Sequence, residues 1–134
     1  MNKGVSKNRL LKLADFLRKL PSKRFNYCVW VALNWVGKLD VSCDTTACAL
    51  GWATAMPEFR RLGLYLNRTR QVSLRGYRVV DRRAIQPSVY AAAKLFGISV
   101  NQAMYLFVPD CNELGFRASA KDVAKHIERF ARSL

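Results

Sequence analysis

Acidic residues are scarce in this sequence: nine Asp and Glu stand against 23 Lys and Arg, and the formal net charge is +14 over 134 residues. The carboxylates are spread along the chain, and no two are arranged as the acid/base pair of a hydrolytic site. This imbalance favours an acidic partner, which can be nucleic acid, an anionic surface or an acidic protein. The alternative is a basic protein whose charge only keeps it in solution.

Metal-binding and phosphate-binding motifs are also missing. His126 is the only histidine, so a histidine metal cluster is excluded, and the seven glycines form no phosphate-binding loop. The four cysteines are a C-x4-C pair, Cys43 and Cys48, and two distant single residues, which is a weak zinc signature. We therefore expect no metal and no cofactor.

Long apolar runs are absent. The longest, Tyr27–Gly37, is interrupted by Asn34 and is too short to cross a bilayer. Met1–Leu20 carries many basic residues and lacks the continuous apolar core of a signal peptide. We expect a soluble, cytoplasmic protein with reduced thiols and no membrane partner.

The apolar content of 51% is enough for a hydrophobic core, and the length suggests one domain over residues 1–134. At its centre, Cys43–Pro57 has no charged residue between Asp44 and Pro57. The pattern predicts a helix that is apolar all round and therefore buried. Asp44 is a suitable N-cap, and Pro57 ends the helix.

The remaining elements follow from periodicity and capping. Amphipathic helices are predicted over residues 6–20, 86–96 and 100–107, and a last helix follows Ser119 as its N-cap, with Asp122 completing a capping box. Residues 24–36 suit either a strand or a helix. A β-hairpin is predicted from strands at 71–74 and 77–80 joined by a turn at Arg75-Gly76. The fold class is α+β, a mainly helical single domain around a buried central helix with one small basic β-hairpin.

The arginine-rich hairpin region is the strongest candidate for a binding surface. Guanidinium groups suit phosphate, and a twisted ribbon can follow a nucleic-acid backbone. The alternative is an edge strand whose charge prevents aggregation. The predicted partner-binding residues, which include the basic face of the first helix, are Arg68, Arg70, Arg75, Arg78, Arg82, Arg83, Lys12 and Arg18.

A second candidate lies in Ala91–Phe107, which resembles a helix-turn-helix with Gly97 at its turn. Asn101, Gln102 and Tyr105 would then face base edges, since Asn and Gln can pair with adenine. Val100–Phe107 contains no Lys or Arg, however, and two helices joined by a short turn are equally typical of ordinary packing.

A third candidate is a cysteine nucleophile, Cys48, with His126 as its base. A reactive thiol needs a lowered pKa, which an apolar setting opposes. The alternative for Cys43 and Cys48 is a hydrophobic staple across a helix N-terminus. The alternative for His126 is a surface residue that flanks the apolar stripe of the last helix.

A sequence motif adds a resemblance to a known family. The motif and the segments that follow it resemble a family of small, functionally uncharacterised proteins from bacteriophages and prophages. This resemblance implies a phage setting in the host bacterial cytoplasm and an accessory role, and it supplies no catalytic residues. The residues that carry it are Cys43-x-Thr45-x-Ala47-Cys48-Ala49-Leu50-Gly51-Trp52-Ala53, Pro57-Glu58-Phe59, Gly63-Leu64 and Leu95-Phe96-Gly97-Ile98-Ser99.

We interpret the sequence as that of a non-enzymatic phage accessory protein that binds an acidic target, either nucleic acid or a host nucleoprotein complex. Inhibition of a bacterial defence, such as a CRISPR effector, is one concrete form of this role. The first alternative is a helix-turn-helix DNA-binding regulator. The second is a cysteine-dependent enzyme.

Overall fold

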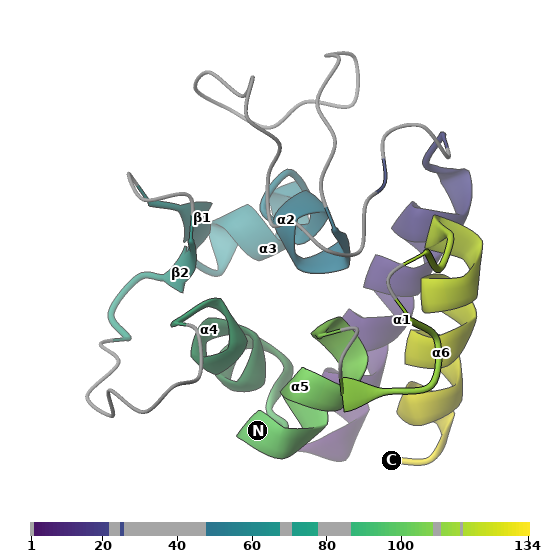
Figure 1. Cartoon of the computed structure of the whole chain (residues 1–134). Coiled ribbons are helices and arrows are strands. Elements are labelled where there is room, and N and C mark those ends of the chain that lie inside the picture. The colour runs from purple at the N-terminus through teal and green to yellow at the C-terminus, as the bar shows by residue number, and fades with distance from the viewer. Residues whose placement is uncertain are drawn as a thin grey trace.

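The computed structural model describes residues 2–21, 25, 48–67, 71–77, 87–108, 111–115 and 117–134. Within these ranges the chain is mostly helical with one small antiparallel sheet, which confirms the predicted α+β class (Figure 1). The elements are α1 (Lys3–Lys19), α2 (Ala49–Ala53), α3 (Pro57–Arg61), β1 (Leu64–Leu66), β2 (Val72–Leu74), α4 (Pro87–Phe96), α5 (Val100–Phe107) and α6 (Ala120–Arg132).

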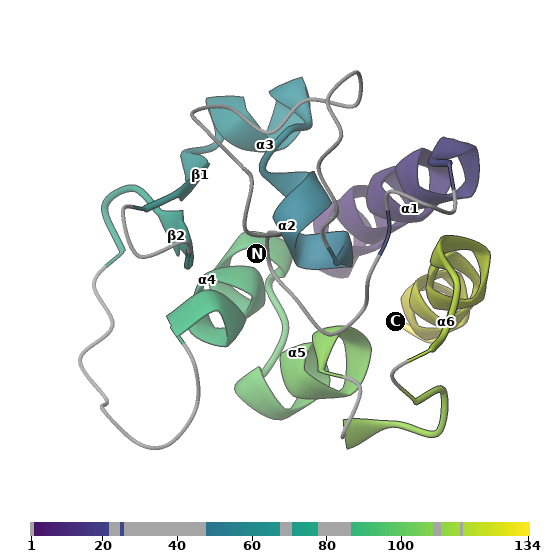
Figure 2. The ribbon, with the colours of Figure 1, turned by 45° about the horizontal axis from the view of Figure 1, so that its top comes forward.

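Helices α1 and α6 lie side by side at one end of the fold in both views (Figures 1 and 2). The predicted apolar face of α1 is buried, and the apolar stripe of α6 belongs to the same core. Helix α1 begins three residues earlier than predicted, because the side chain of Asn2 accepts a hydrogen bond from the backbone N–H of Val5 at 2.8 Å. The buried residues of the two helices include Leu10, Leu13, Leu17, Val123, Ile127 and Ala131.

Helix α2 is the buried element predicted for the centre of the chain. All five of its residues are buried, and the Trp52 ring lies 6.1 Å from that of Phe16. Its start differs from the prediction: Cys48 is the N-cap and has extended backbone geometry, so a helix that continues from Asp44 through Cys48 is wrong. Asp44 itself lies outside the described residues, as does Cys43 with the predicted staple.

The hairpin exists, and its second strand, β2, falls within the predicted strand at 71–74, but the strand with which it pairs was not predicted. Strand β2 pairs with β1, which precedes it, with Leu64 opposite Leu74 and Leu66 opposite Val72. Asn67 closes the connection, because its side-chain oxygen accepts from the backbone N–H of Gln71 at 3.0 Å. The predicted turn at Arg75-Gly76 follows β2, and most of the strand predicted beyond it, residues 78–80, lies outside the described part of the chain.

The last three helices begin as their local sequences predict. Pro87 is the first residue of α4, and Gly97 beyond its end has a φ of 64°. Ser99 and Ser119 cap α5 and α6 through reciprocal capping boxes with Gln102 and Asp122, respectively.

Two contacts bring the hairpin onto the helices. The backbone N–H of Val72 donates to the buried hydroxyl of Ser88 on α4 at 2.8 Å, and that hydroxyl donates to the side-chain oxygen of Gln71 at 2.7 Å. Phe59 of α3 packs edge-on against Phe96 of α4, with ring centroids 5.5 Å apart. The hairpin and α3 therefore form a surface whose inner side is anchored to the core.

Candidate anion-binding site

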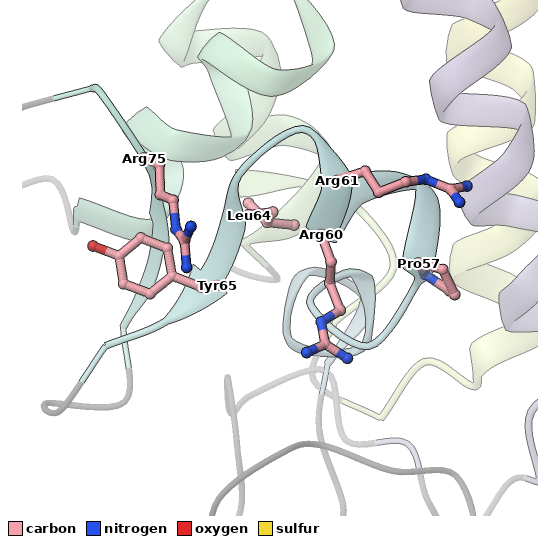
Figure 3. Close-up of a pocket in the computed structure, with 6 residues that line it drawn as sticks. All are labelled: Pro57, Arg60, Arg61, Leu64, Tyr65 and Arg75. Atoms are coloured by element: carbon pink, nitrogen blue, oxygen red, sulfur yellow. The ribbon is translucent and has the colours of Figure 1, made fainter.

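A hollow of about 370 Å³ lies between α3 and the hairpin (Figure 3). Among the described residues that line it, three are arginines, one is a tyrosine and none is acidic. A surface of this composition attracts anions, because guanidinium groups bind phosphate or carboxylate oxygens through paired hydrogen bonds. We call it the arginine hollow; its lining residues are Pro57, Arg60, Arg61, Leu64, Tyr65 and Arg75.

Helix α3 supplies two of the arginines. Phe59 points into the core and is 1% exposed, so the residues that follow it in this short helix face solvent. Arg60 and Arg61 are both exposed in the last turn, and Figure 3 shows their side chains extending in different directions. The pair therefore spreads positive charge along the rim of the hollow.

The hairpin supplies the third arginine and the tyrosine. Side chains alternate along β1, so Leu64 is buried while Tyr65 is 41% exposed. Arg75 follows β2, and its backbone N–H donates to the carbonyl oxygen of Gly63 at 2.9 Å. Figure 3 shows the Arg75 side chain running past the Tyr65 ring, on the same wall of the hollow.

The positive charge of the arginine hollow is not neutralised by the described part of the chain. There, Arg60, Arg61 and Arg75 form no ion pair, although Glu58 lies on the same short helix as the first two. Exposed apolar surface adjoins the charge, since Leu62 and Tyr77 are among the exposed large side chains. The arginine hollow therefore combines three cations with the Tyr65 ring, which is open to solvent.

Of the three residues predicted to bind a partner that lie in the described ranges, Arg75 lines the arginine hollow. Lys12 and Arg18 lie on α1, which Figures 1 and 2 place beside α6 and away from the hairpin. Arg18 forms ion pairs with Asp15 and Glu128, so its charge is engaged within the fold. The other five, Arg68, Arg70, Arg78, Arg82 and Arg83, lie outside the described residues.

Arg60 and Arg61 were not among the predicted site residues. The available signal was an Arg-Arg pair followed closely by Gly63, at the end of a short helix. What the sequence did not indicate is that Arg75, fourteen positions beyond Arg61 in the chain, lines the same hollow.

The three residues predicted to contact bases lie on α5. Asn101 is exposed, but the side-chain oxygen of Gln102 accepts from the backbone N–H of Ser99 at 2.9 Å and belongs to the helix cap. The Tyr105 ring is partly exposed and packs 4.6 Å from the His126 ring. These contacts favour the interpretation of α4 and α5 as a packed helical corner.

His126 is buried, so its predicted position on the surface is wrong. Its side chain is 4% exposed, and its Nε2 lies 3.0 Å from the carbonyl oxygen of Tyr105. Because a carbonyl oxygen only accepts hydrogen bonds, Nε2 carries the proton of this contact.

Cys48 is also buried, at the N-cap of α2. In the described ranges, no cluster of three His, Cys, Asp or Glu residues is placed to hold a metal ion.

Comparison with protein-family models, with curated proteins and with solved structures finds no match for this chain. None of the helices in the described ranges combines the length and the apolar character needed to cross a bilayer.

Proposed function

We propose that this protein binds nucleic acid through the arginine hollow and has no enzymatic activity of its own. The observation that carries the proposal is that Arg60, Arg61 and Arg75 line one open hollow and that none of the described residues in its lining is acidic. The net charge of +14 would add long-range attraction to any polyanion.

The exposed ring of Tyr65 favours nucleic acid over an acidic protein. A base can stack on an aromatic side chain while neighbouring arginines hold the phosphates. An acidic protein would engage the arginines but would leave the ring without a matched contact. The nucleic acid can be free or part of a host nucleoprotein complex.

The phage setting that the sequence resemblance implies gives this binding a biological use. A small basic protein that occupies the guide–target channel of a CRISPR effector, or holds its bound nucleic acid, would block that defence. We propose such a counter-defence role in the host cytoplasm as the specific form of the function.

The test is a fluorescence-anisotropy titration of the full chain with single-stranded RNA, single-stranded DNA and duplex DNA at two salt concentrations. The variant Arg60→Gln/Arg61→Gln/Arg75→Gln removes the charge of the hollow. The control Lys3→Gln/Lys94→Gln/Arg117→Gln removes the same charge from exposed positions on α1, α4 and the segment before α6.

We expect the hollow variant to bind at least tenfold more weakly than the wild type, and the control to change by less than threefold. The salt dependence should also weaken, because each lost phosphate contact reduces the magnitude of the negative slope of log K against log salt by about 0.7–0.9. If the hollow variant and the control lost the same affinity, the lower net charge alone would explain the effect. Absence of binding at low salt would refute the proposal.

A further inference from the structure

Helix α6 carries a row of exposed cations that is inclined to the helix axis. Lys121, Lys125 and Arg129 are all exposed and recur every four residues, so they lie above one another on one face of the helix. A rise of 1.5 Å per residue places successive members about 6 Å apart along the axis. We call Lys121, Lys125 and Arg129 the α6 row.

The acidic residues of α6 are engaged elsewhere. Asp122 accepts from the backbone N–H of Ser119 at 3.2 Å as part of the capping box. Glu128 forms ion pairs with Arg18 of α1 and with Arg132. The described part of the chain offers the α6 row no ion pair of its own.

Most of this row is unfavourable for the helix itself, since Lys121 lies in the first turn and only Arg129 lies in the last turn, where the helix dipole favours a cation. Like charges at i and i+4 destabilise a helix, whereas alternating Glu and Lys at the same spacing would stabilise it. Packing does not require these cations, since the core contacts of α6 come from its opposite, apolar face. An uncompensated row at this spacing is therefore better explained by an external polyanion than by folding.

The α6 row and the arginine hollow lie at opposite ends of the fold. Figures 1 and 2 are related by a rotation about the horizontal axis, which preserves horizontal separation. Both show the hairpin at one side and α6 at the other, with α2 between them. One short stretch of nucleic acid held in the hollow would not lie along the α6 row as well.

We infer that the α6 row is a second nucleic-acid surface, which holds the phosphate backbone of a duplex, and that the protein bridges two nucleic-acid segments. Among the described residues, α6 has no exposed aromatic side chain of its own: Phe130 is partly buried against the core, and the partly exposed Tyr105 ring of α5 packs on His126. The α6 row is therefore suited to sequence-independent phosphate contacts along a regular backbone. The bridging rests on the proposed function of the hollow; binding at the α6 row does not.

The variant that tests this is Lys121→Gln/Lys125→Gln/Arg129→Gln. Glutamine has a helix propensity close to those of lysine and arginine, and the change relieves like-charge repulsion. Urea unfolding should therefore show a midpoint at or above that of the wild type. The control Lys3→Gln/Lys94→Gln/Arg117→Gln lowers the net charge by the same amount.

The first measurement is affinity for a fluorescent DNA duplex by anisotropy. We expect the α6-row variant to bind at least fivefold more weakly than the wild type, while the control changes by less than threefold. An unchanged affinity, or an equal loss in both variants, would overturn the inference. Loss of binding to anionic lipid vesicles with duplex binding intact would also overturn it and would identify the row as a membrane-surface contact.

The second measurement is bridging: capture of the fluorescent duplex by an immobilised duplex in the presence of protein. The wild type should capture it, and both the α6-row and the hollow variants should lose at least four-fifths of the signal. Full capture by the α6-row variant would overturn the bridging. If the hollow variant kept both duplex affinity and duplex capture while the α6-row variant lost both, the proposed function of the hollow would be wrong, and binding at the α6 row would be supported.

Discussion

Arg75 and Gly63 are held together by their backbones: the N–H of Arg75 donates to the carbonyl oxygen of Gly63 at 2.9 Å. Gly63 adopts a φ of 103°, in the left-handed region that side chains other than glycine rarely enter. A Cβ at this position would lie 3.1 Å from the Cβ of Arg75. The hydrogen bond between Arg75 and Gly63 joins the segment after α3 to the end of β2 and thereby fixes two walls of the arginine hollow.

Replacing Gly63 with alanine should therefore damage both stability and the site. We expect Gly63→Ala to lower the free energy of unfolding by about 2–3 kcal/mol, from backbone strain and the crowding of Arg75. Urea denaturation measures this loss. Gly76→Ala is the matched control, because Gly76 also has a positive φ, of 77°, but open space around it. It should cost about 1 kcal/mol, and equal costs would contradict a close packing of Gly63 against Arg75.

The buried hydroxyl of Ser88 is expected to be important for the hairpin. Ser88→Ala leaves the N–H of Val72 and the side-chain oxygen of Gln71 without this partner, and Ser88 is 0% exposed. We expect a loss of about 1–3 kcal/mol in the free energy of unfolding, measured by chemical denaturation. Ser133→Ala, at an exposed C-cap, should cost less than about 0.5 kcal/mol. Faster amide exchange at Val72 in Ser88→Ala would confirm that the change acts on β2.

His126 is expected to stabilise the packing of α5 on α6. We expect His126→Ala to lower the free energy of unfolding by about 1–3 kcal/mol, because it removes a buried ring and its hydrogen bond to Tyr105. Nucleic-acid affinity of the folded fraction should stay within twofold of the wild type. Asn101→Ala, at an exposed position of α5, should change neither quantity. A loss of base-specific binding in Asn101→Ala would instead support the helix-turn-helix alternative.

The ion pair between Arg18 and Glu128 should contribute modestly to the packing of α1 on α6. Their side chains are 39% and 22% exposed, so solvent and salt screen the attraction. A double-mutant cycle with Arg18→Gln and Glu128→Gln should give a coupling of about 0.5–1 kcal/mol that falls as salt rises. A coupling that is the same at low and high salt would contradict an electrostatic origin.

Short-range features determined most of the helices. The capping boxes at Ser99 and Ser119 involve residues only three positions apart, and Pro87 and Gly97 set the two ends of α4 through their own backbone preferences. The apolar periodicity of α1 and α6 likewise predicted which side chains are buried. Such local signals can be recognised in the sequence without knowledge of the rest of the fold.

The pairing of the hairpin was beyond these local signals. Strands of three residues carry little pattern, and the sequence predicted residues 77–80, most of which lie outside the described ranges, as the partner of β2. The tertiary structure pairs β2 with β1, so that Leu64 and Val72 are both buried against the core while Ser88 binds the backbone of β2. Burial by elements distant in sequence decided the register.

The same distinction holds for the site. The sequence alone determined that the chain is strongly basic, mainly helical and rich in arginine between residues 60 and 83. Only the tertiary structure decided that Arg60, Arg61 and Arg75 line one hollow, that Arg18 is engaged by Glu128, and that His126 is buried. The physical reason is that charge and helical period are properties of the local chain. Convergence, pairing and burial depend on contacts between segments that only folding brings together.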